Sequence, residues 1–360
     1  MKQFISKILA QANVVIDGPE EWDIQIHNPN FYSKVLAQGV FGLGEAYIDG
    51  WWDCRNLELF LERVLTAKLD MCLRTPSNLW AVVKAHLFNM QNKTSALKTN
   101  CHYNLGNDFY RALLGPTMFY TCGYWRDATT LEDAQLAKAQ LICEKLKLSP
   151  GMSVLEFGCG WGEFAKYITD KHNVYYTGCS LSAAQISEAR TRCGNQATFR
   201  QQDYIDIIGR FDRMVSMGFL EHIGRKHYRD HLKSIYDMLT DDGLAVIHAI
   251  ARNDSNASGA NNDKWIRKYI FPCGELPSLT QIAQASEDLL VIEDVQNIGP
   301  DYYNTLIAWY NNLQQIPDVK FKRMWDYYLL GCAVHFKLRN MQLYQIVFSK
   351  KHEQRYDSPR

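Results

Sequence analysis

The stretch Val154-Leu-Glu-Phe-Gly-Cys-Gly-Trp-Gly162 decides the fold of this chain of 360 residues. A short apolar run leads straight into three alternating glycines and then into a segment with helical character. Glycines at such a strand-to-helix turn let the backbone approach a bulky ligand closely, because no Cβ atom stands in the way. The pattern fits a dinucleotide or S-adenosylmethionine. The G-x-G-x-G spacing, with Glu156 just before the first glycine, favours S-adenosylmethionine.

The residues around this turn alternate between strand-like and helix-like segments. Such alternation predicts a mostly parallel sheet with helices on both faces, and a ligand at the carboxyl ends of the strands. Strands are predicted at 152–157, 173–179, 197–202, 211–217, 243–250, 288–296 and 341–349. Helices are predicted at 162–171, 183–192, 226–239, 303–315 and 320–339.

Three local signals refine this prediction. Thr129-x-x-Glu132 has the form of a capping box, and the apolar spacing up to Leu148 supports a long helix after it. Asp241-Asp-Gly243 predicts a turn before the fifth strand. His227 and His231 are four residues apart and resemble a metal-binding pair, but a third ligand at suitable spacing is missing. We therefore interpret them as part of a solvated helix face, and no metal site is expected.

The remaining segments suggest further domains. Residues 1–88 have helical periodicity, and 89–100 form a polar linker to a catalytic domain that spans 101–360. Trp51 and Trp52 fit either a lipid-facing edge or core packing. Residues 251–285 are rich in Asn, Ser and Gly and then carry aromatic residues, so we expect a lid-like insertion there.

The charge, cysteine content and apolar runs of the chain limit which partners and which cellular compartment we expect. Lys plus Arg and Asp plus Glu both number 39, so bulk charge gives no reason to expect a nucleic-acid partner. The ten cysteines form no C-x-x-C pair, which favours reduced thiols in a cytosolic protein. No apolar run approaches the ~20 residues of a membrane-spanning helix. A lipid substrate would therefore be met from the aqueous side.

Polar residues follow several of the predicted strands. Ser180 and Gln185 are candidates to hold the ribose of the cofactor after the second strand. After the third strand, Asp203 is a candidate acceptor for the adenine amine and Tyr204 a candidate to stack on the ring. Glu221 lies just past the fourth strand, where active-site groups gather in this architecture.

These segments together resemble the cyclopropane fatty acid synthases and their mycolic-acid-modifying relatives. The resemblance covers nearly the whole chain, and its N-terminal part is similar to the longer bacterial branch that modifies phospholipids. It implies a Rossmann-like class I S-adenosylmethionine-dependent methyltransferase with a seven-stranded sheet and a smaller helical N-terminal domain. The segments that carry it are Gly42–Trp52, His102–Tyr110, Tyr120–Trp125, Val154–Gly162, Cys179–Ser182, Phe219–Gly224, Ile247–Ile250, Tyr269–Pro272, Tyr302–Trp309 and Tyr328–Cys332.

The resemblance implies a methylene transfer from S-adenosylmethionine to the cis double bond of a phospholipid acyl chain. The double bond attacks the methyl group, a carbocation forms, and bound bicarbonate removes a proton so that the ring closes. The positions that match the bicarbonate site of the family are Cys122, Glu221, His248, Ile250 through its backbone, and Tyr302. Glu221 is expected either to accept the bicarbonate proton or to pair with His248. Cys332 matches a cysteine proposed as a nucleophile, and a buried thiol near the pocket is the alternative.

The cofactor contacts that the resemblance implies fall on Tyr120, Thr121, Glu156, Gly158, Gly160, Trp161, Gly162, Ser180, Gln185, Asp203 and Tyr204. Thr121 stands where the family usually has serine, Glu156 where it has aspartate, Cys179 where it has an aliphatic residue and Ser180 where it has threonine. The resemblance also implies a homodimer with transient, peripheral contact with the inner membrane. A methyltransferase of a small soluble amine or phenol, a non-catalytic lipid-binding protein and an enzyme that leaves a methyl branch are the alternatives.

Overall fold

The computed structural model describes residues 1–69, 105–255, 264–272, 274–351 and 355–360. The chain forms two compact units. One comprises Met1–Met90, Ala257–Pro272 and Leu306–Asn340, and the other comprises Gln91–Asn256, Cys273–Thr305 and Met341–Arg360. The predicted linker 89–100 lies outside the described residues. The division into 1–88, 89–100 and 101–360 remains a prediction.

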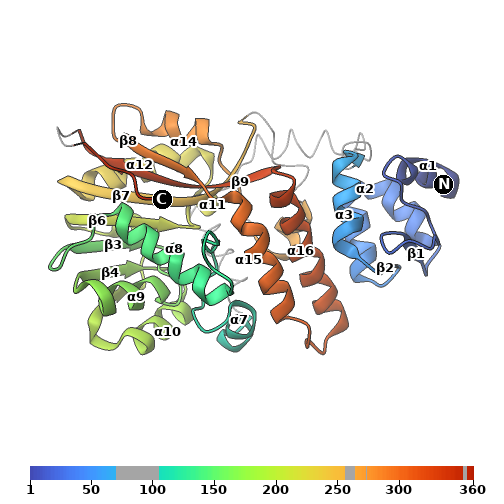
Figure 1. Ribbon diagram of the computed structural model, residues 1–360, viewed down its shortest axis with the longest axis horizontal. Helices are drawn as coiled ribbons and strands as arrows, with labels where there is room; N and C mark the ends of the chain where they lie inside the picture. Colours follow the sequence, from blue (N-terminus) through green and yellow to red (C-terminus); the bar gives the residue numbers. More distant parts are fainter. Residues whose placement is uncertain (70–104, 256–263, 273, 352–354) are drawn as a thin grey trace. The chain divides into compact units, whose positions relative to one another are not determined.

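The second unit is built on a seven-stranded sheet with the order β5-β4-β3-β6-β7-β9-β8 (Figure 1). The first five strands in this order pair in parallel, whereas β9 runs antiparallel to both β7 and β8. This topology confirms the predicted seven-stranded, mostly parallel sheet. The strands are β3 (Ser153–Phe157), β4 (Tyr175–Cys179), β5 (Ala197–Arg200), β6 (Phe211–Met217), β7 (Leu239–Arg252), β8 (Val291–Asn297) and β9 (Met341–Ser349).

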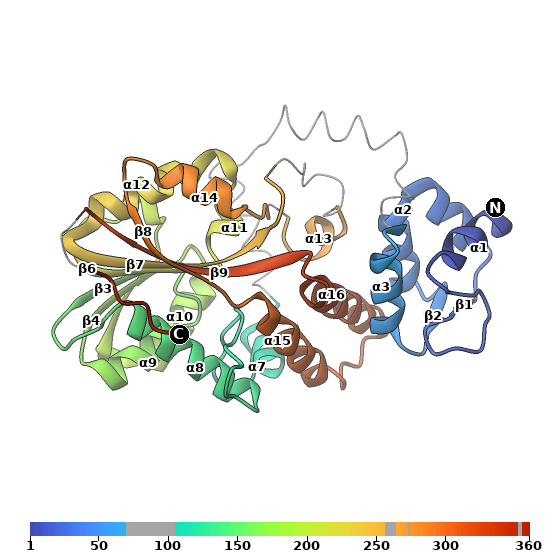
Figure 2. The same cartoon turned by 45° about the horizontal axis from the view of Figure 1, so that its top comes forward.

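Helices cover both faces of this sheet, as predicted (Figures 1 and 2). On one face α8 (Leu131–Lys145), α9 (Glu163–His172) and α10 (Ala183–Cys193) bury a core cluster that includes Ile142, Phe164 and Val246. On the other face α11 (Leu220–Ile223), α12 (Tyr228–Met238) and α14 (Leu279–Ser286) bury a second cluster that includes Leu232 and Ile346. The short elements are α7 (Asn107–Leu114) and the 3-10 turns η1 (Gly194–Gln196), η2 (Tyr204–Asp206) and η3 (Arg225–His227).

Two local predictions were wrong. The N-cap of α8 is Thr130 rather than Thr129: Thr130 has extended backbone angles, and its side chain accepts a hydrogen bond of 3.1 Å from the Asp133 N–H. Asp241-Asp-Gly243 forms no turn before a strand, because β7 runs from Leu239 through it. The pairing of β6 with β7 shifts register between Phe211 and Arg213, and this irregularity accommodates the polar tripeptide within the strand.

The first unit is mainly helical, in agreement with the prediction for the N-terminal region. It contains α1 (Lys2–Ala10), α2 (Asn30–Ile48), α3 (Leu57–Thr66), α13 (Lys264–Tyr269), α16 (Val319–Lys337) and a small sheet of β1 (Ile24–Ile26) and β2 (Trp52–Cys54). The helix α15 (Gly299–Asn312) begins in the second unit and ends in this one. Residues 251–285 hold α13 and α14, and their covering role remains a prediction.

Trp52 belongs to the core of the first unit. Its side chain is fully buried, and its ring lies 5.0 Å from the ring centroids of both Tyr47 and Phe60. Trp51 is only half-buried, and the Lys34 ammonium lies 4.3 Å above its ring. Core packing, rather than a lipid-facing edge, therefore accounts for Trp52.

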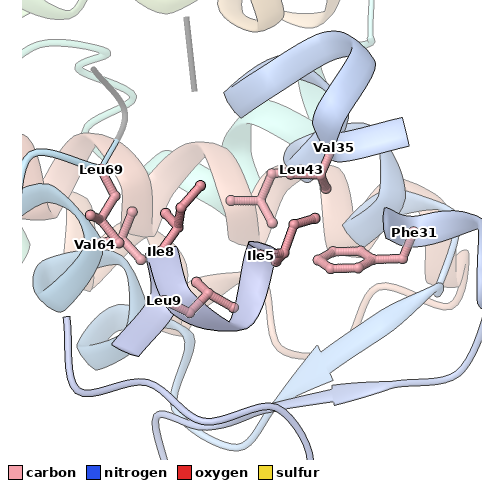
Figure 3. Close-up of a pocket in the computed structure, with 8 residues that line it drawn as sticks. All are labelled: Ile5, Ile8, Leu9, Phe31, Val35, Leu43, Val64 and Leu69. Carbon is pink, nitrogen blue, oxygen red and sulfur yellow. The ribbon is translucent and has the colours of Figure 1, made fainter. Parts of the chain in front are cut away.

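The same unit encloses a small apolar cavity of about 20 Å³ (Figure 3). Its walls are the aliphatic and aromatic side chains of Ile5, Ile8, Leu9, Phe31, Val35, Leu43, Val64 and Leu69. Such a volume holds about one water molecule, so the cavity is a packing gap and not a site for an acyl chain. No helix in the described ranges has both the length and the apolar character needed to cross a bilayer.

Candidate active site

The three glycines between β3 and α9 all have left-handed backbone angles, with φ of +74° at Gly158, +52° at Gly160 and +80° at Gly162. The Gly158 N–H donates a 3.0 Å hydrogen bond to the Cys179 carbonyl, which fixes the turn to the end of β4. A Cβ atom at Gly162 would lie 2.9 Å from the Cβ of Ala189 on α10. The turn therefore needs glycine both for its backbone angles and for the close approach of a neighbouring helix.

Two acidic side chains lie buried around this turn. Glu156, on β3, accepts a hydrogen bond from the Tyr176 hydroxyl, and burial raises the pKa of its carboxyl to about 8. Glu163 begins α9, and its carboxylate occupies the space where a Cβ of Gly160 would be. Burial raises the pKa of Glu163 to about 7. The hydrogen bond between Glu156 and Tyr176 joins β3, which leads into the turn, to the neighbouring strand β4. The contact of Glu156 with the cofactor remains a prediction.

An aromatic wall connects the predicted Tyr120 and Trp161. The Tyr110 ring on α7 lies 4.8 Å from the Trp161 ring and 5.6 Å from the Tyr120 ring, measured between centroids. The Trp161 indole N–H donates a 2.9 Å hydrogen bond to the Asn107 side chain. Asn107 and Tyr110 lie in the segment His102–Tyr110, and through these contacts they orient two predicted cofactor residues.

The two residues predicted for the ribose lie together at the end of β4. The Ser180 hydroxyl donates a 2.9 Å hydrogen bond to the Gln185 side-chain oxygen. Ser182 caps α10 by accepting from the Gln185 N–H at 3.3 Å, so the cap places Gln185 beside Ser180.

The two residues predicted for adenine follow β5. Asp203 caps η2 by accepting a 3.3 Å hydrogen bond from the Ile205 N–H. The buried Tyr204 ring lies 5.2 Å from the Phe219 ring, and Phe219 is also the neighbour that a Cβ at Gly158 would meet. The adenine candidates and the glycine turn therefore share one aromatic neighbour.

His231 is not on a solvated helix face, and this interpretation was wrong. Its side chain is fully buried and stacks on Phe219 with ring centroids 5.5 Å apart. Burial lowers the pKa of His231 to about 3, so the imidazole is neutral. His227, in contrast, is half-exposed. Within the described ranges no cluster of three or more potential ligands could hold a metal ion.

Glu221 lies on α11, just past the carboxyl end of β6. Its side chain is buried, and its Oε1 accepts a 2.7 Å hydrogen bond from the backbone N–H of Ile250 on β7. Its Oε2 has no hydrogen-bond partner among the described residues. Burial raises the pKa of this carboxyl to about 7. Glu221 thus holds one oriented oxygen and one oxygen available to a ligand.

His248 lies two residues before Ile250 on the same strand. Its Nδ1 is 3.4 Å from the side-chain nitrogen of Gln345 on β9, and its Nε2 has no partner in the described part of the chain. When Gln345 donates to Nδ1, the proton of the neutral ring lies on Nε2. Burial keeps the pKa of His248 well below its usual range. The lack of partners at Nε2 and at Glu221 Oε2 also means that these two groups do not pair directly.

Cys122 and Tyr302 lie on two segments that are bonded to one another. The buried Cys122 sulfur is 3.9 Å from the Ile298 carbonyl, and the Gly123 N–H donates to the Thr305 hydroxyl at 3.0 Å. Tyr302 is buried on α15 between Ile298 and Thr305 in sequence. Burial raises the pKa of the Cys122 thiol well above its usual range, so the thiol is neutral and can donate a hydrogen bond.

Cys332 is half-buried on α16, which belongs to the first unit. Its predicted role near the pocket remains a prediction. Among the described residues no two cysteines form a disulfide. The reduced state of the thiols remains a prediction.

The sequence interpretation missed Lys138. Its side chain is fully buried on α8, and its ammonium donates a 2.9 Å hydrogen bond to the Thr121 hydroxyl. Gln135, one turn earlier, donates to the Thr121 carbonyl at 2.8 Å. The sequence did contain a signal for this burial. Lys138 is four residues before the apolar Ile142, and this spacing places both on the same buried face of the helix.

Comparisons with known proteins agree with this architecture. Residues 90–346 match the family model described as mycolic acid cyclopropane synthetase. The cyclopropane-fatty-acyl-phospholipid synthase of Escherichia coli strain K12 is 44% identical over 355 residues, which are 96% of this chain and 92% of that protein. A probable fatty acid methyltransferase of Pseudomonas putida is 32% identical, over 91% of this chain and 86% of its own.

Solved structures are similar as well. The cyclopropane synthase MmaA2 of Mycobacterium tuberculosis superimposes with a TM-score of 0.68 at 27% identity, over 72% of this chain and 99% of its own. The mycolic acid cyclopropane synthase CmaA1, complexed with SAH and CTAB, gives a TM-score of 0.66 at 30% identity, over 71% of this chain and 98% of its own. The protein is therefore an S-adenosylmethionine-dependent methyltransferase that belongs to the cyclopropane-fatty-acyl-phospholipid synthase family, whose relatives include the mycolic acid cyclopropane synthases.

Proposed function

We propose that this protein transfers a methylene group from S-adenosylmethionine to the cis double bond of an unsaturated phospholipid acyl chain and so forms a cyclopropane ring. Family membership and the named activity of the Escherichia coli relative support the substrate class. The observation that carries the chemistry is a pair of buried polar atoms without partners among the described residues, Glu221 Oε2 and His248 Nε2. Glu221 lies on α11, which follows the carboxyl end of β6, and His248 lies in the carboxyl-terminal half of β7.

The residues around the glycine turn fit S-adenosylmethionine. The turn leaves backbone free of Cβ atoms at Gly158 and Gly160, and Ser180 and Gln185 offer hydroxyl and amide groups for the ribose. Tyr204 offers an aromatic face for adenine. When bound, the cofactor supplies an electrophilic methyl group. An alkene is a weak nucleophile, so the part of the protein is to hold donor and acceptor in contact.

We further propose that bicarbonate binds at Glu221 and His248 and supplies the base. A buried polar atom left without a partner costs about 1–3 kcal/mol, and such atoms commonly mark an unseen ligand. Bicarbonate fits both atoms, because its oxygens can accept from an Nε2–H and its hydroxyl can donate to a carboxylate oxygen. We infer that the neutral thiol of Cys122, which lies 3.1 Å from the Gly123 carbonyl, and the hydroxyl of Tyr302 are further contacts of the anion.

For Ile250 we propose a part in orienting Glu221, in addition to the backbone contact with the anion that the resemblance implies. Its N–H donates to Glu221 Oε1, so this backbone group orients the carboxylate. Glu221 then presents Oε2 in a fixed direction. A carboxyl with a pKa of about 7 can exchange a proton at neutral pH, which suits it to take a proton onward from the anion.

The surroundings suit a positively charged reaction intermediate. Aromatic side chains at Tyr110, Tyr120, Trp161 and Phe219 border the turn and exclude water. Ring faces also stabilise a nearby cation. A water molecule in their place would trap the cation as an alcohol instead of allowing ring closure.

The experiment is to incubate the purified protein with S-adenosylmethionine and vesicles of an unsaturated phospholipid. We expect acyl chains that gain one CH₂ and whose proton NMR spectrum contains cyclopropane resonances. A gain of CH₂ with a vinylic methyl signal would establish methyl branching instead. Unchanged acyl chains would exclude the proposed substrate, and methylation of a soluble amine or phenol would then be tested.

Membrane contact, a cytoplasmic location and a homodimer remain proposals. An acyl chain in a bilayer can be reached only at the membrane, so we infer transient peripheral binding at the inner membrane. Co-sedimentation with anionic and neutral vesicles tests the contact, and light scattering coupled to gel filtration tests the dimer. A protein that stays in the supernatant with substrate vesicles would exclude the first, and a monomer mass would exclude the second.

A further inference from the structure

The helix α8 buries two lysines, Lys138 and Lys145, and among the described residues only Lys145 has a carboxylate oxygen within 4.0 Å of its ammonium. Both side chains are fully buried. Lys145 lies 3.3 Å from a carboxylate oxygen of Asp294, which also binds Arg360. Across the described ranges, no carboxylate oxygen lies within 4.0 Å of the Lys138 ammonium. An ammonium without a counter-ion is costly to bury, so its retention needs a reason other than stability.

Lys138 contacts two residues of the segment Phe119–Cys122, namely Phe119 and Thr121. Its ammonium donates to the Thr121 hydroxyl at 2.9 Å and lies 3.4 Å from the centroid of the Phe119 ring. Gln135 adds the 2.8 Å hydrogen bond to the Thr121 carbonyl. This segment carries the predicted cofactor residue Tyr120 and the predicted donor Cys122. One buried side chain thus touches the residues on both sides of Tyr120.

Titratable groups on four neighbouring segments interact electrostatically with the Lys138 ammonium. Cys122 belongs to the segment itself, Glu163 to α9, Glu156 to β3 and His248 to β7. Burial lowers the pKa of Lys138 to about 7, while Glu163, Cys122 and Glu156 act in the opposite direction. The ammonium of Lys138, like that of Lys145, helps to keep His248 neutral, and of the two only Lys138 also acts on the Cys122 thiol. The charge therefore acts on the same thiol and imidazole that are proposed to hold the anion.

We propose that Lys138 is a positioning residue of the methylene transfer: its ammonium fixes the Phe119–Cys122 segment through the Thr121 hydroxyl and adds positive charge to the site of Cys122 and His248. This inference rests on the proposed function and deepens it. It assigns a role to a residue that makes no expected contact with substrate or cofactor. It also gives the Thr121 hydroxyl a role as the acceptor for the Lys138 ammonium.

The test compares Lys138→Met with Lys145→Met, a matched control that removes a fully buried amine from the same helix. We expect Lys138→Met to lower kcat by about 10-fold or more, because it loosens the catalytic segment and removes its charge. Lys145→Met is expected to lower the melting temperature but to leave kcat within about two-fold. Equal kcat values for both variants would overturn the proposal.

The pH dependence of kcat gives a second readout. The ammonium form exists below the pKa of Lys138, so the ratio of wild-type kcat to that of Lys138→Met should fall as pH rises through about 7. The ratio is used because Glu221, whose pKa is also about 7, must lose its proton before it can accept one and therefore raises kcat of both proteins over the same range. The ratio of Lys138→Arg to Lys138→Met should not fall, because arginine keeps its charge. A wild-type ratio that does not vary with pH would contradict the role of the charge.

Hydrogen exchange of the S-adenosylhomocysteine complex separates this proposal from the proposed function. We expect faster exchange of the Gly123 and Tyr124 amides, which donate to the Thr305 hydroxyl and the Ala134 carbonyl directly after this segment, in Lys138→Met and in Thr121→Val, and wild-type exchange in Lys145→Met and Thr121→Ser. This result is independent of turnover, so it holds even if phospholipids prove not to be the substrate. If Lys138→Met does not fold, Thr121→Val decides, and unchanged exchange in it would exclude the positioning role.

Discussion

The Glu221 carboxylate and the Ile250 backbone N–H are joined by a hydrogen bond of 2.7 Å that links α11 to β7. The bond fixes one carboxylate oxygen and leaves the other without a partner among the described residues. A side chain held in this way has little rotational freedom left to lose when a ligand binds. Glu221 therefore presents its second oxygen in a fixed direction.

Glu221→Gln should reduce kcat by about 100-fold or more and leave the affinity for S-adenosylhomocysteine nearly unchanged. The amide oxygen of glutamine still accepts from Ile250, but the amide cannot take up a proton. Isothermal titration calorimetry and a turnover assay on vesicles measure the two quantities. Glu275→Gln is the control, because the backbone N–H of Glu275 donates to the Glu221 carbonyl at 2.8 Å while its half-buried carboxylate accepts from the Arg225 N–H. Equal losses of binding and turnover would point to misfolding instead.

Gly162→Ala should destabilise the protein more than Gly50→Ala. Both glycines have positive φ, of +80° and +69°, so both substitutions strain the backbone. Only the first adds a Cβ that meets Ala189, at 2.9 Å, whereas nothing lies within 4 Å of the second. We expect an additional loss of about 1–3 kcal/mol for Gly162→Ala in urea unfolding. Similar losses for the two variants would show that helix α10 can move away.

Asp203→Asn should weaken the binding of S-adenosylhomocysteine by about 10-fold, because a charged acceptor for the adenine amine becomes neutral. Asparagine can still cap η2 through its side-chain oxygen, so the fold should be kept. Asp206→Asn, on an exposed residue of the same turn, is the control and should bind normally. Calorimetry decides, and unchanged affinity in Asp203→Asn would remove this residue from the cofactor site.

His231→Leu should make the protein less sensitive to acid. The pKa of His231 is about 3 in the folded state, below its usual value of 6.5, so the unfolded chain binds a proton that the folded chain refuses. Stability contributed by the neutral ring is therefore present above pH 6.5 and is lost as pH falls from there toward 3. The free-energy difference between wild type and variant should change by about 1 kcal/mol per pH unit in this window.

Urea unfolding curves of both proteins at several pH values across that window provide the measurement. A difference that does not vary with pH would mean that the imidazole is protonated in the folded state. Leucine removes the titrating group and places an apolar side chain against Phe219, on whose ring His231 stacks in the wild-type protein.

The sequence by itself determined the sheet, its flanking helices and the glycine turn. These features follow from local periodicity and from backbone angles that only glycine adopts freely, and both are visible along the chain. The resemblance then pointed to Cys122, Glu221, His248 and Tyr302 as one group. Local signals were less reliable at the ends of elements, where Thr130 rather than Thr129 caps α8 and Asp241–Gly243 continue a strand.

Only the tertiary structure decided which polar groups meet. Gln345 reaches His248 across 97 residues of sequence because β7 and β9 pair in register, and no pattern along the chain contains that pairing. The burial of His231 depends on the packing of α12 over Phe219, and its sequence spacing suggested exposure instead. The proposed positioning role of Lys138 depends on the packing of α8 against the Phe119–Cys122 segment. Periodicity reports which face a residue occupies, whereas the partner on that face depends on how distant segments pack.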